Sequence, residues 1–260
     1  MDSAIGVFDS GVGGTSVWKE IVKLLPNERT IYLADSKNAP YGGKAPKEIV
    51  ALSIKNTELL LQKGCKLVVV ACNTATTNAI DYLRKNYPVP FIGIEPAIKP
   101  AALHTKTKKV GILATKGTLS SSLFYNTSKL FAQGIEVIEQ DGSGLVQLIE
   151  EGNVYTEATK YLLEKYLAPM LNAGIDSLVL GCTHYPYLIP VLRQILPESI
   201  TILDSSEAVA RQTKHILSEK GLLSLGSKAT AKHDIYTNHT IEVLKYYVNV
   251  PGALVNLLDF

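Results

Sequence analysis

Lys66-Leu-Val-Val-Val-Ala71, followed directly by Cys72-Asn-Thr-Ala-Thr-Thr77, is the stretch of this chain that decides its fold. Asp176-Ser-Leu-Val-Leu-Gly181, followed by Cys182-Thr-His-Tyr-Pro186, repeats the plan 110 residues later. Both apolar runs are short and uninterrupted by charge, which is typical of strands buried on both faces of a parallel sheet. Ligands of such sheets bind just beyond the carboxyl ends of the strands. The two cysteines therefore predict one active site with a sulfur atom from each half of the chain.

The composition predicts a soluble, cytoplasmic α/β protein. The 260 residues are 46% hydrophobic and 19% charged, which is enough for a sizeable core in one large or two modest domains. The formal net charge of +2, without a block of like charges, predicts no nucleic-acid partner and no membrane surface. The N-terminus lacks the pattern of a secretory signal, and no apolar run approaches the roughly 20 residues that span a bilayer. The 3 cysteines form no CxxC pair, so neither disulfides nor a zinc knuckle are indicated.

Strands and helices alternate along the chain in two similar halves. We expect strands at 5–8, 30–33, 67–71 and 91–94, and again at 110–113, 135–138, 178–180 and 200–204. Ile5-Gly-Val-Phe8 is echoed by Val110-Gly-Ile-Leu113 at an offset of 105, and 91–95 is echoed by 200–204 at an offset of 109. Each half is therefore predicted to be a β-α-β-α-β-α-β unit, which is typical of an internal duplication.

This repeat predicts two pseudo-symmetric, parallel-sheet α/β domains with the active site in the cleft between them. The first domain is expected to comprise 1–95 plus 207–260, and the second 96–206. The tail after about Ser206 is expected to contain a helix, a loop around Gly226, a strand at 233–237 and a final helix. We expect this tail to cross back and pack on the first half.

Two thiols that face each other across a cleft suit a particular reaction, in which one removes a proton from one face of a carbon and the other delivers a proton to the opposite face. One sulfur must be a thiolate and the other a thiol when each turnover begins. A free cysteine has a pKa near 8.5, and the helix N-termini after Cys72 and Cys182 are expected to lower it. Neither has a partner at metal-ligand spacing. Cys65 lacks this context and is expected to be a core residue.

The glycine-rich segment Asp9–Gly14 lies between the first strand and its helix. It lacks a GxGxxG pattern and a P-loop lysine, which leaves two interpretations. The glycines either cradle a phosphate or allow backbone N–H groups at the helix N-terminus to bind a carboxylate. Asp9 either orients, deprotonates or binds a ligand group, or it simply caps the helix.

Polar residues at two other predicted helix N-termini are further candidates. Asn73, Thr74 and Thr183 either cap helices or bind carboxylates, and the two roles do not exclude each other. His184, two residues from Cys182, is a candidate acid or base.

Two further segments can be interpreted either as purely structural or as functional. The turn Pro40-Tyr-Gly-Gly43 either closes over a ligand or is a plain turn. Glu150 ends a helical stretch and is expected to be a solvated helix end.

Four motifs occur in order along nearly the whole chain: Ile5-Gly-Val-Phe-Asp-Ser-Gly-Val-Gly-Gly14, Pro40-Tyr-Gly42, Ala71-Cys-Asn-Thr-Ala75 and Gly181-Cys-Thr-His-Tyr-Pro186. Together they resemble the glutamate racemases of bacterial cell-wall synthesis. The resemblance implies interconversion of L- and D-glutamate by two cysteines that act as alternating acid and base, and a supply of D-glutamate for peptidoglycan. It implies no cofactor, no metal and glutamate as the small-molecule partner. A homodimer is compatible with the sequence.

The resemblance also implies roles for individual residues. Cys72 is expected to act on D-glutamate and Cys182 on L-glutamate, with Asp9 and His184 as assistants to the thiols. Asp35 and Glu150 are expected nearby. The implied substrate contacts are Asp9, Ser10, Tyr41, Gly42, Asn73, Thr74, Thr183 and His184.

The chain departs from the family pattern at two positions. Thr15 and Tyr187 stand where leucine is common, and they are expected to affect packing rather than chemistry. The related aspartate racemases usually have histidine after Cys-Asn-Thr-Ala and glutamate after Gly-Cys-Thr, whereas this chain has Thr76 and His184, which favours glutamate. Two alternatives remain open: a racemase of the same superfamily for another amino acid or a hydantoin, and a non-catalytic amino-acid-binding protein, in which paired thiols would have no purpose.

Overall fold

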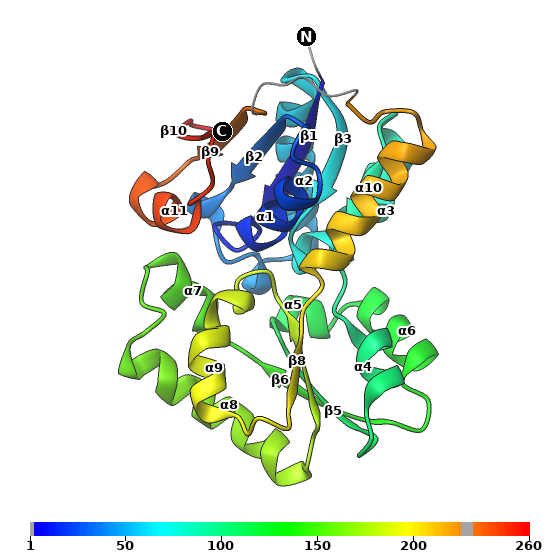
Figure 1. Cartoon of the computed structure of the whole chain (residues 1–260), viewed down its shortest axis with the longest axis vertical. Helices are drawn as coiled ribbons and strands as arrows, with labels where there is room; N and C mark the ends of the chain where they lie inside the picture. Colours follow the sequence, from blue (N-terminus) through cyan, green and yellow to red (C-terminus); the bar gives the residue numbers. More distant parts are fainter. Residues whose placement is uncertain (1–2, 225–230) are drawn as a thin grey trace.

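The computed structural model describes residues 3–224 and 231–260, which form two separate sheets (Figure 1). From edge to edge, the six-stranded sheet contains β10 (Ala253–Leu257), β9 (His233–Thr237), β2 (Thr30–Ala34), β1 (Ala4–Asp9), β3 (Cys65–Val70) and β4 (Phe91–Gly93). The four-stranded sheet contains β6 (Glu136–Asp141), β5 (Lys109–Ala114), β7 (Ser177–Gly181) and β8 (Thr201–Leu203). All neighbouring strands are parallel.

The two sheets share one strand order, which confirms the predicted α/β architecture of two similar units. The order β2-β1-β3-β4 in the first sheet matches β6-β5-β7-β8 in the second. The first sheet is built from strands before residue 95 and after residue 207, and the second from strands between them, but the exact domain boundaries stay a prediction. The Ser205 hydroxyl donates a hydrogen bond to the Glu95 carbonyl, so the two connections between the halves run side by side.

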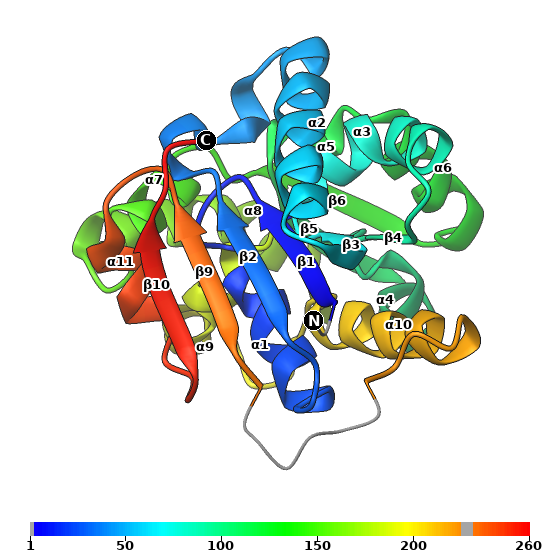
Figure 2. The same ribbon diagram turned by 90° about the horizontal axis from the view of Figure 1, so that it is seen from above.

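Helices cover both faces of the larger sheet, as expected for strands that are apolar throughout (Figure 2). One face carries α2 (Pro46–Gln62) and α3 (Asn73–Asn86), and the other carries α1 (Thr15–Leu24) and α10 (Ser206–Glu219). All six residues of β1 are buried, and a buried Val, Ile or Phe side chain contributes about 1.5–3 kcal/mol. Helix α2 begins with Pro46, where the missing N–H costs nothing.

The other helices surround the smaller sheet or belong to the tail. They are α4 (Ile98–His104), α5 (Lys116–Leu119), α6 (Ser122–Phe131), α7 (Leu145–Glu150), α8 (Glu157–Ala173), α9 (Ile189–Ile195) and α11 (Ile241–Tyr247). Three 3₁₀ turns, η1 (Ser36–Asn38), η2 (Tyr41–Gly43) and η3 (Tyr185–Leu188), follow strands β2 and β7. One apolar cluster runs from Trp18 of α1 to Leu163 of α8, so the two halves share part of their core.

The tail crosses back onto the first half as predicted, but it ends differently. Strand β9 pairs with β2, and α10 packs against α1. The predicted helix after β9 is present as α11, but it is not the last element, because strand β10 follows it and pairs with β9. Five residues at a sheet edge carry little pattern of their own, and pairing with β9 decides their conformation. The predicted loop around Gly226 lies outside the described residues.

Candidate active site

Both cysteines line one small cavity between the two sheets. Cys72 lies two residues beyond the end of β3, and Cys182 directly follows β7. The lining residues are Ser10, Pro40, Tyr41, Gly42, Cys72, Asn73, Thr74, Thr115, Val146, Cys182, Thr183 and His184. This set includes every site residue that the sequence predicted except Asp9. Asp9 is fully buried and accepts a hydrogen bond of 3.3 Å from the hydroxyl of Thr183.

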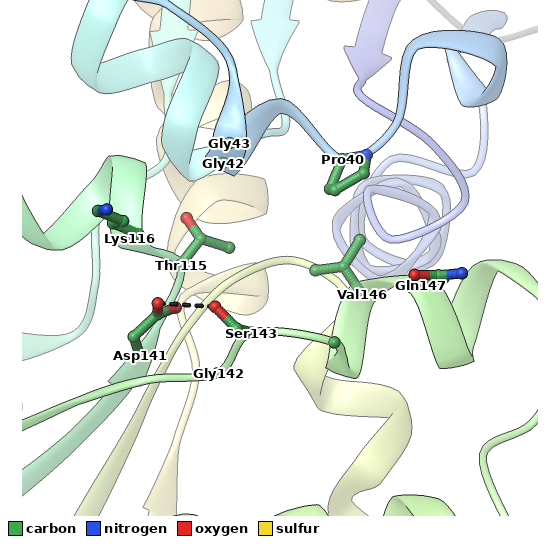
Figure 3. Close-up of a pocket in the computed structure, with 11 residues that line it drawn as sticks. Pro40, Gly42, Gly43, Thr115, Lys116, Asp141, Gly142, Ser143, Val146 and Gln147 are labelled. Carbon is green, nitrogen blue, oxygen red and sulfur yellow. Dashed lines mark hydrogen bonds between the residues drawn. The ribbon is translucent and has the colours of Figure 1, made fainter.

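The cavity is closed around the two sulfur atoms. Its free volume is only about 10 Å³, roughly the space of one water molecule. A larger pocket of about 190 Å³ adjoins it, and the Ser143 hydroxyl in that pocket donates a hydrogen bond of 2.7 Å to Asp141 (Figure 3). Both spaces are lined by Pro40, Gly42, Thr115 and Val146. A cavity of this size has no room for an amino acid, so it must open before a ligand of that size can reach the sulfur atoms.

Cys72 occupies the N-cap position of α3. Its Sγ accepts a hydrogen bond of 3.4 Å from the backbone N–H of Ala75 and lies 3.7 Å from the hydroxyl of Ser10. Burial raises the pKa of the Cys72 thiol well above its ordinary value, and the carboxylate of Asp9 raises it further. The backbone N–H of Ala75 at the helix N-terminus does lower this pKa as expected, but the prediction of a net lowering was wrong, because the loss of water destabilises the thiolate by more than the hydrogen bonds stabilise it.

Cys182 has a different partner. Its Sγ lies 3.8 Å from Nδ1 of His184, whose Nε2 lies 2.5 Å from Oε1 of Glu150. Burial alone lowers the pKa of His184, but the hydrogen bonds to Cys182 and Glu150 outweigh it and raise the pKa well above its ordinary value. At neutral pH the imidazole is therefore protonated, and it can stabilise a thiolate at Cys182. The two sulfur atoms sit in unequal surroundings, as alternating roles require.

Glu150 connects the two halves, and the prediction of a solvated helix end was wrong. Its side chain is only 15% exposed. Besides the contact to His184, its carboxylate accepts hydrogen bonds of 2.6 Å from the backbone N–H of Val12 and 2.9 Å from the hydroxyl of Ser36. Sequence pattern could not find these partners, because Val12 lies 138 positions away in the chain.

The glycines of the Asp9–Gly14 segment allow the second half to approach closely. A Cβ atom on Gly11 would lie 1.9 Å from Oε1 of Glu150, and one on Gly13 would lie 2.2 Å from Nδ1 of His184. The N–H groups of this loop do bind carboxylates, but in this structure they belong to the protein. Val12 binds Glu150, and Gly14 donates to Asp9 at 2.8 Å. Since Gly14 is the N-cap residue of α1, Asp9 also braces the start of that helix.

The carboxyl of Asp9 is expected to make stability depend on pH. Burial raises the pKa of Asp9 from 3.8 to about 6. The stability linked to this proton is fully present below pH 3.8 and is lost as the pH rises through 6. Asp9→Asn avoids that loss, so its advantage in unfolding free energy over the parent should grow between pH 4 and 7 by up to about 3 kcal/mol. The measurement is urea unfolding of the parent and of Asp9→Asn across this pH range. A difference in unfolding free energy that does not change with pH would contradict the prediction.

The amide of Asn73 is the clearest sign that the cavity receives a polar ligand. Asn73 is 3% exposed and lines the cavity, and neither its Oδ1 nor its Nδ2 has a hydrogen-bond partner among the described residues. Leaving such a group unpaired costs about 1–3 kcal/mol. A carboxylate or ammonium group of a ligand would remove that cost.

The sequence analysis missed two threonines of the second half. The hydroxyls of Thr115 and Thr118 lie 2.9 Å and 3.4 Å from the hydroxyl of Thr74, and 3.1 Å from each other. Thr115 follows β5 as Ser10 follows β1, so the internal repeat carried a signal for it. The three hydroxyls of Thr74, Thr115 and Thr118 add hydrogen-bonding groups where the two halves are in contact.

Tyr41 and Asp35 form a buried pair behind the cavity. The Tyr41 hydroxyl donates a hydrogen bond of 2.5 Å to Asp35, and Lys55 lies 3.2 Å from the same carboxylate. Burial raises the pKa of Tyr41, with the Asp35 carboxylate adding to the effect, so the phenol stays protonated. This pair holds the Pro40–Gly43 turn in place, with Tyr41 and Gly42 on the cavity.

Residues 3–224 and 231–260 contain neither a candidate metal site nor a helix that could span a membrane. Within these ranges, histidine, cysteine and carboxylate side chains form no group of three or more that could hold a metal ion. The helices in the same ranges are too short or too polar to cross a membrane.

The chain is similar to known proteins over most of its length. A family model described as Asp/Glu/Hydantoin racemase matches residues 5–213. A protein of Herpetosiphon aurantiacus named glutamate racemase is 47% identical over 223 residues, which are 86% of this chain and 88% of the relative. A Pseudomonas aeruginosa protein of the same name is 46% identical over 231 residues, 88% of this chain and 87% of the relative.

Solved structures extend the similarity to the whole fold. The glutamate racemase of Escherichia coli, in complex with L-glutamate and the activator UDP-MurNAc-ala, has a TM-score of 0.86 at 32% identity and covers 100% of this chain and 99% of its own. The glutamate racemase of Francisella tularensis in complex with D-glutamate has a TM-score of 0.85 at 27% identity and covers 99% of this chain and 98% of its own.

Proposed function

Because the chain belongs to the Asp/Glu/hydantoin racemase family, we propose that it is a glutamate racemase that interconverts L- and D-glutamate without a cofactor. The observation that carries this proposal is the pair of cysteines in one closed cavity, each with a different helper. Cys182 lies beside a protonated imidazole, whereas Cys72 lies near a buried carboxylate that favours its thiol form. Such a pair meets the requirement for one thiolate and one thiol at the start of a turnover.

The reaction transfers two protons and changes no oxidation state. From L-glutamate, the Cys182 thiolate removes the Cα proton while the Cys72 thiol delivers its own proton to the opposite face. The enzyme is then left with a Cys182 thiol and a Cys72 thiolate, which is the form that acts on D-glutamate. The first form returns when Cys182 loses its proton to solvent and Cys72 gains one, and the His184 imidazolium, held by Glu150, then stabilises the Cys182 thiolate. Near Cys72, Asp9, whose pKa is raised to about 6, is the group that can exchange a proton with the thiol.

Polar groups around the cavity are suited to the two carboxylates and the ammonium group of glutamate. Asn73 and Thr74 lie at the N-terminus of α3, where backbone N–H groups favour an anion. The hydroxyls of Ser10 and Thr183 and the amide of Asn73 can pair with the remaining polar atoms. The complexes of relatives with L- and D-glutamate support this substrate. By resemblance, we place the reaction in the bacterial cytoplasm, where its product D-glutamate supplies peptidoglycan synthesis.

Deuterium exchange tests the activity and the two-base scheme together. When the protein acts on L-glutamate in heavy water without added cofactor, deuterium should appear at Cα of D-glutamate before it appears in the remaining L-glutamate. The reason is that the delivering sulfur carries a proton from solvent, whereas the removing sulfur holds the proton taken from substrate. Proton NMR with chiral chromatography follows both pools.

The same assay separates the alternatives. Faster exchange of L-aspartate, another L-amino acid or a hydantoin than of L-glutamate would assign another substrate. Binding of glutamate without any exchange would identify a non-catalytic binding protein. Equal labelling of both enantiomers from the start would contradict the two-base scheme.

A further inference from the structure

Tyr187, a residue of the second half, is held on several sides by residues of the first half. It lies in η3, three positions after His184, and its hydroxyl lies 2.5 Å from Oγ1 of Thr15, the first residue of α1. Its ring stacks on Tyr247 of α11 with centroids 4.1 Å apart, and Nζ of Lys19 lies 5.4 Å from its centroid. The tail helix α11 therefore takes part in joining the halves.

The direction of the hydrogen bond follows from the other partners. The Thr15 hydroxyl donates to the Val12 carbonyl at 2.6 Å, so its only proton is already used. Tyr187 must therefore donate to Thr15. Burial raises the pKa of Tyr187, which keeps this proton in place at working pH. Removing the Tyr187 hydroxyl leaves Thr15 bound to Val12 and removes only the hydrogen bond from Tyr187 to Thr15.

This contact lies next to the groups that serve Cys182. The backbone N–H of Tyr187 donates to the His184 carbonyl at 3.1 Å. The hydroxyl of Tyr247 donates to the carbonyl of Ile149, the residue before Glu150, at 3.3 Å. Tyr187 and Tyr247 thus anchor both chain segments that carry the His184–Glu150 pair against the first half.

We propose that Tyr187 is a positioning residue for Cys182, because its bond to Thr15 and its stacking on Tyr247 hold the His184–Glu150 pair against the Asp9–Gly14 loop in the closed form. The assignment rests on the proposed racemase function, in which His184 serves Cys182. Tyr187 does not line the cavity and acts only through His184. Cys72 has its own supports, Ala75 and Ser10, in the first half. Loss of the Tyr187 hydroxyl should therefore weaken one base and spare the other.

A one-base reaction can report on each sulfur separately. From 3-chloroglutamate, removal of the Cα proton by one thiolate expels chloride, and the resulting enamine hydrolyses to 2-oxoglutarate and ammonia. The L-form reports on Cys182 and the D-form on Cys72. In Tyr187→Phe we expect kcat/KM for elimination from the L-form to fall roughly 3- to 10-fold, the range of one neutral hydrogen bond. Elimination from the D-form should stay within about 2-fold of the parent.

Two further variants complete the experiment. Tyr246→Phe removes the phenol of a neighbouring tyrosine that is 66% exposed and should leave both eliminations unchanged. Thr15→Val removes the acceptor, so adding it to Tyr187→Phe should weaken elimination from the L-form by less than the product of the two single effects. Melting temperatures of all variants show whether the fold is kept.

The parent protein is assayed first for racemisation of glutamate. An inactive parent would overturn the proposed function itself. With an active parent, equal losses for both forms of chloroglutamate would reduce Tyr187 to a general packing residue and overturn the proposal. Unchanged elimination from the L-form would overturn it as well.

Discussion

Cys72→Ser and Cys182→Ser are each expected to abolish racemisation of glutamate, with a loss on the order of 10³-fold or more in kcat/KM from either enantiomer. A serine hydroxyl is far too weak an acid and its alkoxide far too scarce at neutral pH to replace a thiol and thiolate. Both directions fail in each variant because every turnover needs one sulfur on each face of Cα. Circular dichroism of L- or D-glutamate solutions measures the rate.

In each variant, the remaining cysteine should still catalyse a reaction that needs only one base. Cys72→Ser should keep elimination from L-3-chloroglutamate, and Cys182→Ser should keep it from the D-form. Cys65→Ala is the matched control, because Cys65 is buried in the apolar core of the first half away from the cavity. It should lose some stability and keep its racemase activity. Full racemisation by either serine variant would refute the two-base scheme.

His184→Asn should have the second largest effect and should be directional. Asparagine cannot supply the positive charge that stabilises the Cys182 thiolate, and removing one such preorganised electrostatic partner costs about 10²–10³-fold. We therefore expect kcat from L-glutamate to fall by about 10²-fold, and by more than kcat from D-glutamate. Asp9→Asn should show the opposite bias, because Asp9 lies near Cys72. Initial rates from both enantiomers across a range of concentrations provide kcat and KM for each variant.

Thermodynamics supplies an internal check on these measurements. Enantiomers have equal free energies, so kcat/KM must remain equal in the two directions, and any change in the ratio of kcat values must be matched in KM. The parent pH profile of kcat/KM should be bell-shaped, since the reaction needs one deprotonated and one protonated group. Equal slowing of both directions by both variants would leave Asp9 and His184 as binding residues only.

Much of the fold followed from local pattern. The apolar runs before Cys72 and Cys182 predicted buried parallel strands, and the repeat of strand positions predicted two units with the same strand order. Because parallel strands end at the same sheet edge, the same pattern indicated that both cysteines, Ser10 and Asn73 would gather at one place. The cavity contains all four.

The errors occurred where a residue's role depends on partners far away in the chain. Glu150 has the local pattern of an exposed helix end, and only the docking of the halves brings Val12 and His184 to its carboxylate. The pKa of Cys72 was predicted from its helix N-terminus, whereas burial has the larger effect. Thr15 and Tyr187 were expected to affect packing, and their hydrogen bond across 172 positions suggests a link to the chemistry as well.

Local pattern was sufficient for the parallel strands, for the order of the helices and for the chemical identity of the two sulfur atoms, because periodicity and side-chain chemistry are properties of short segments. It could not determine that burial raises the pKa of Cys72, how little space surrounds the two sulfur atoms, or how Tyr187 and Glu150 join the halves. Those properties arise from desolvation and from contacts between segments more than a hundred residues apart, and such contacts exist only once both sheets have formed and docked.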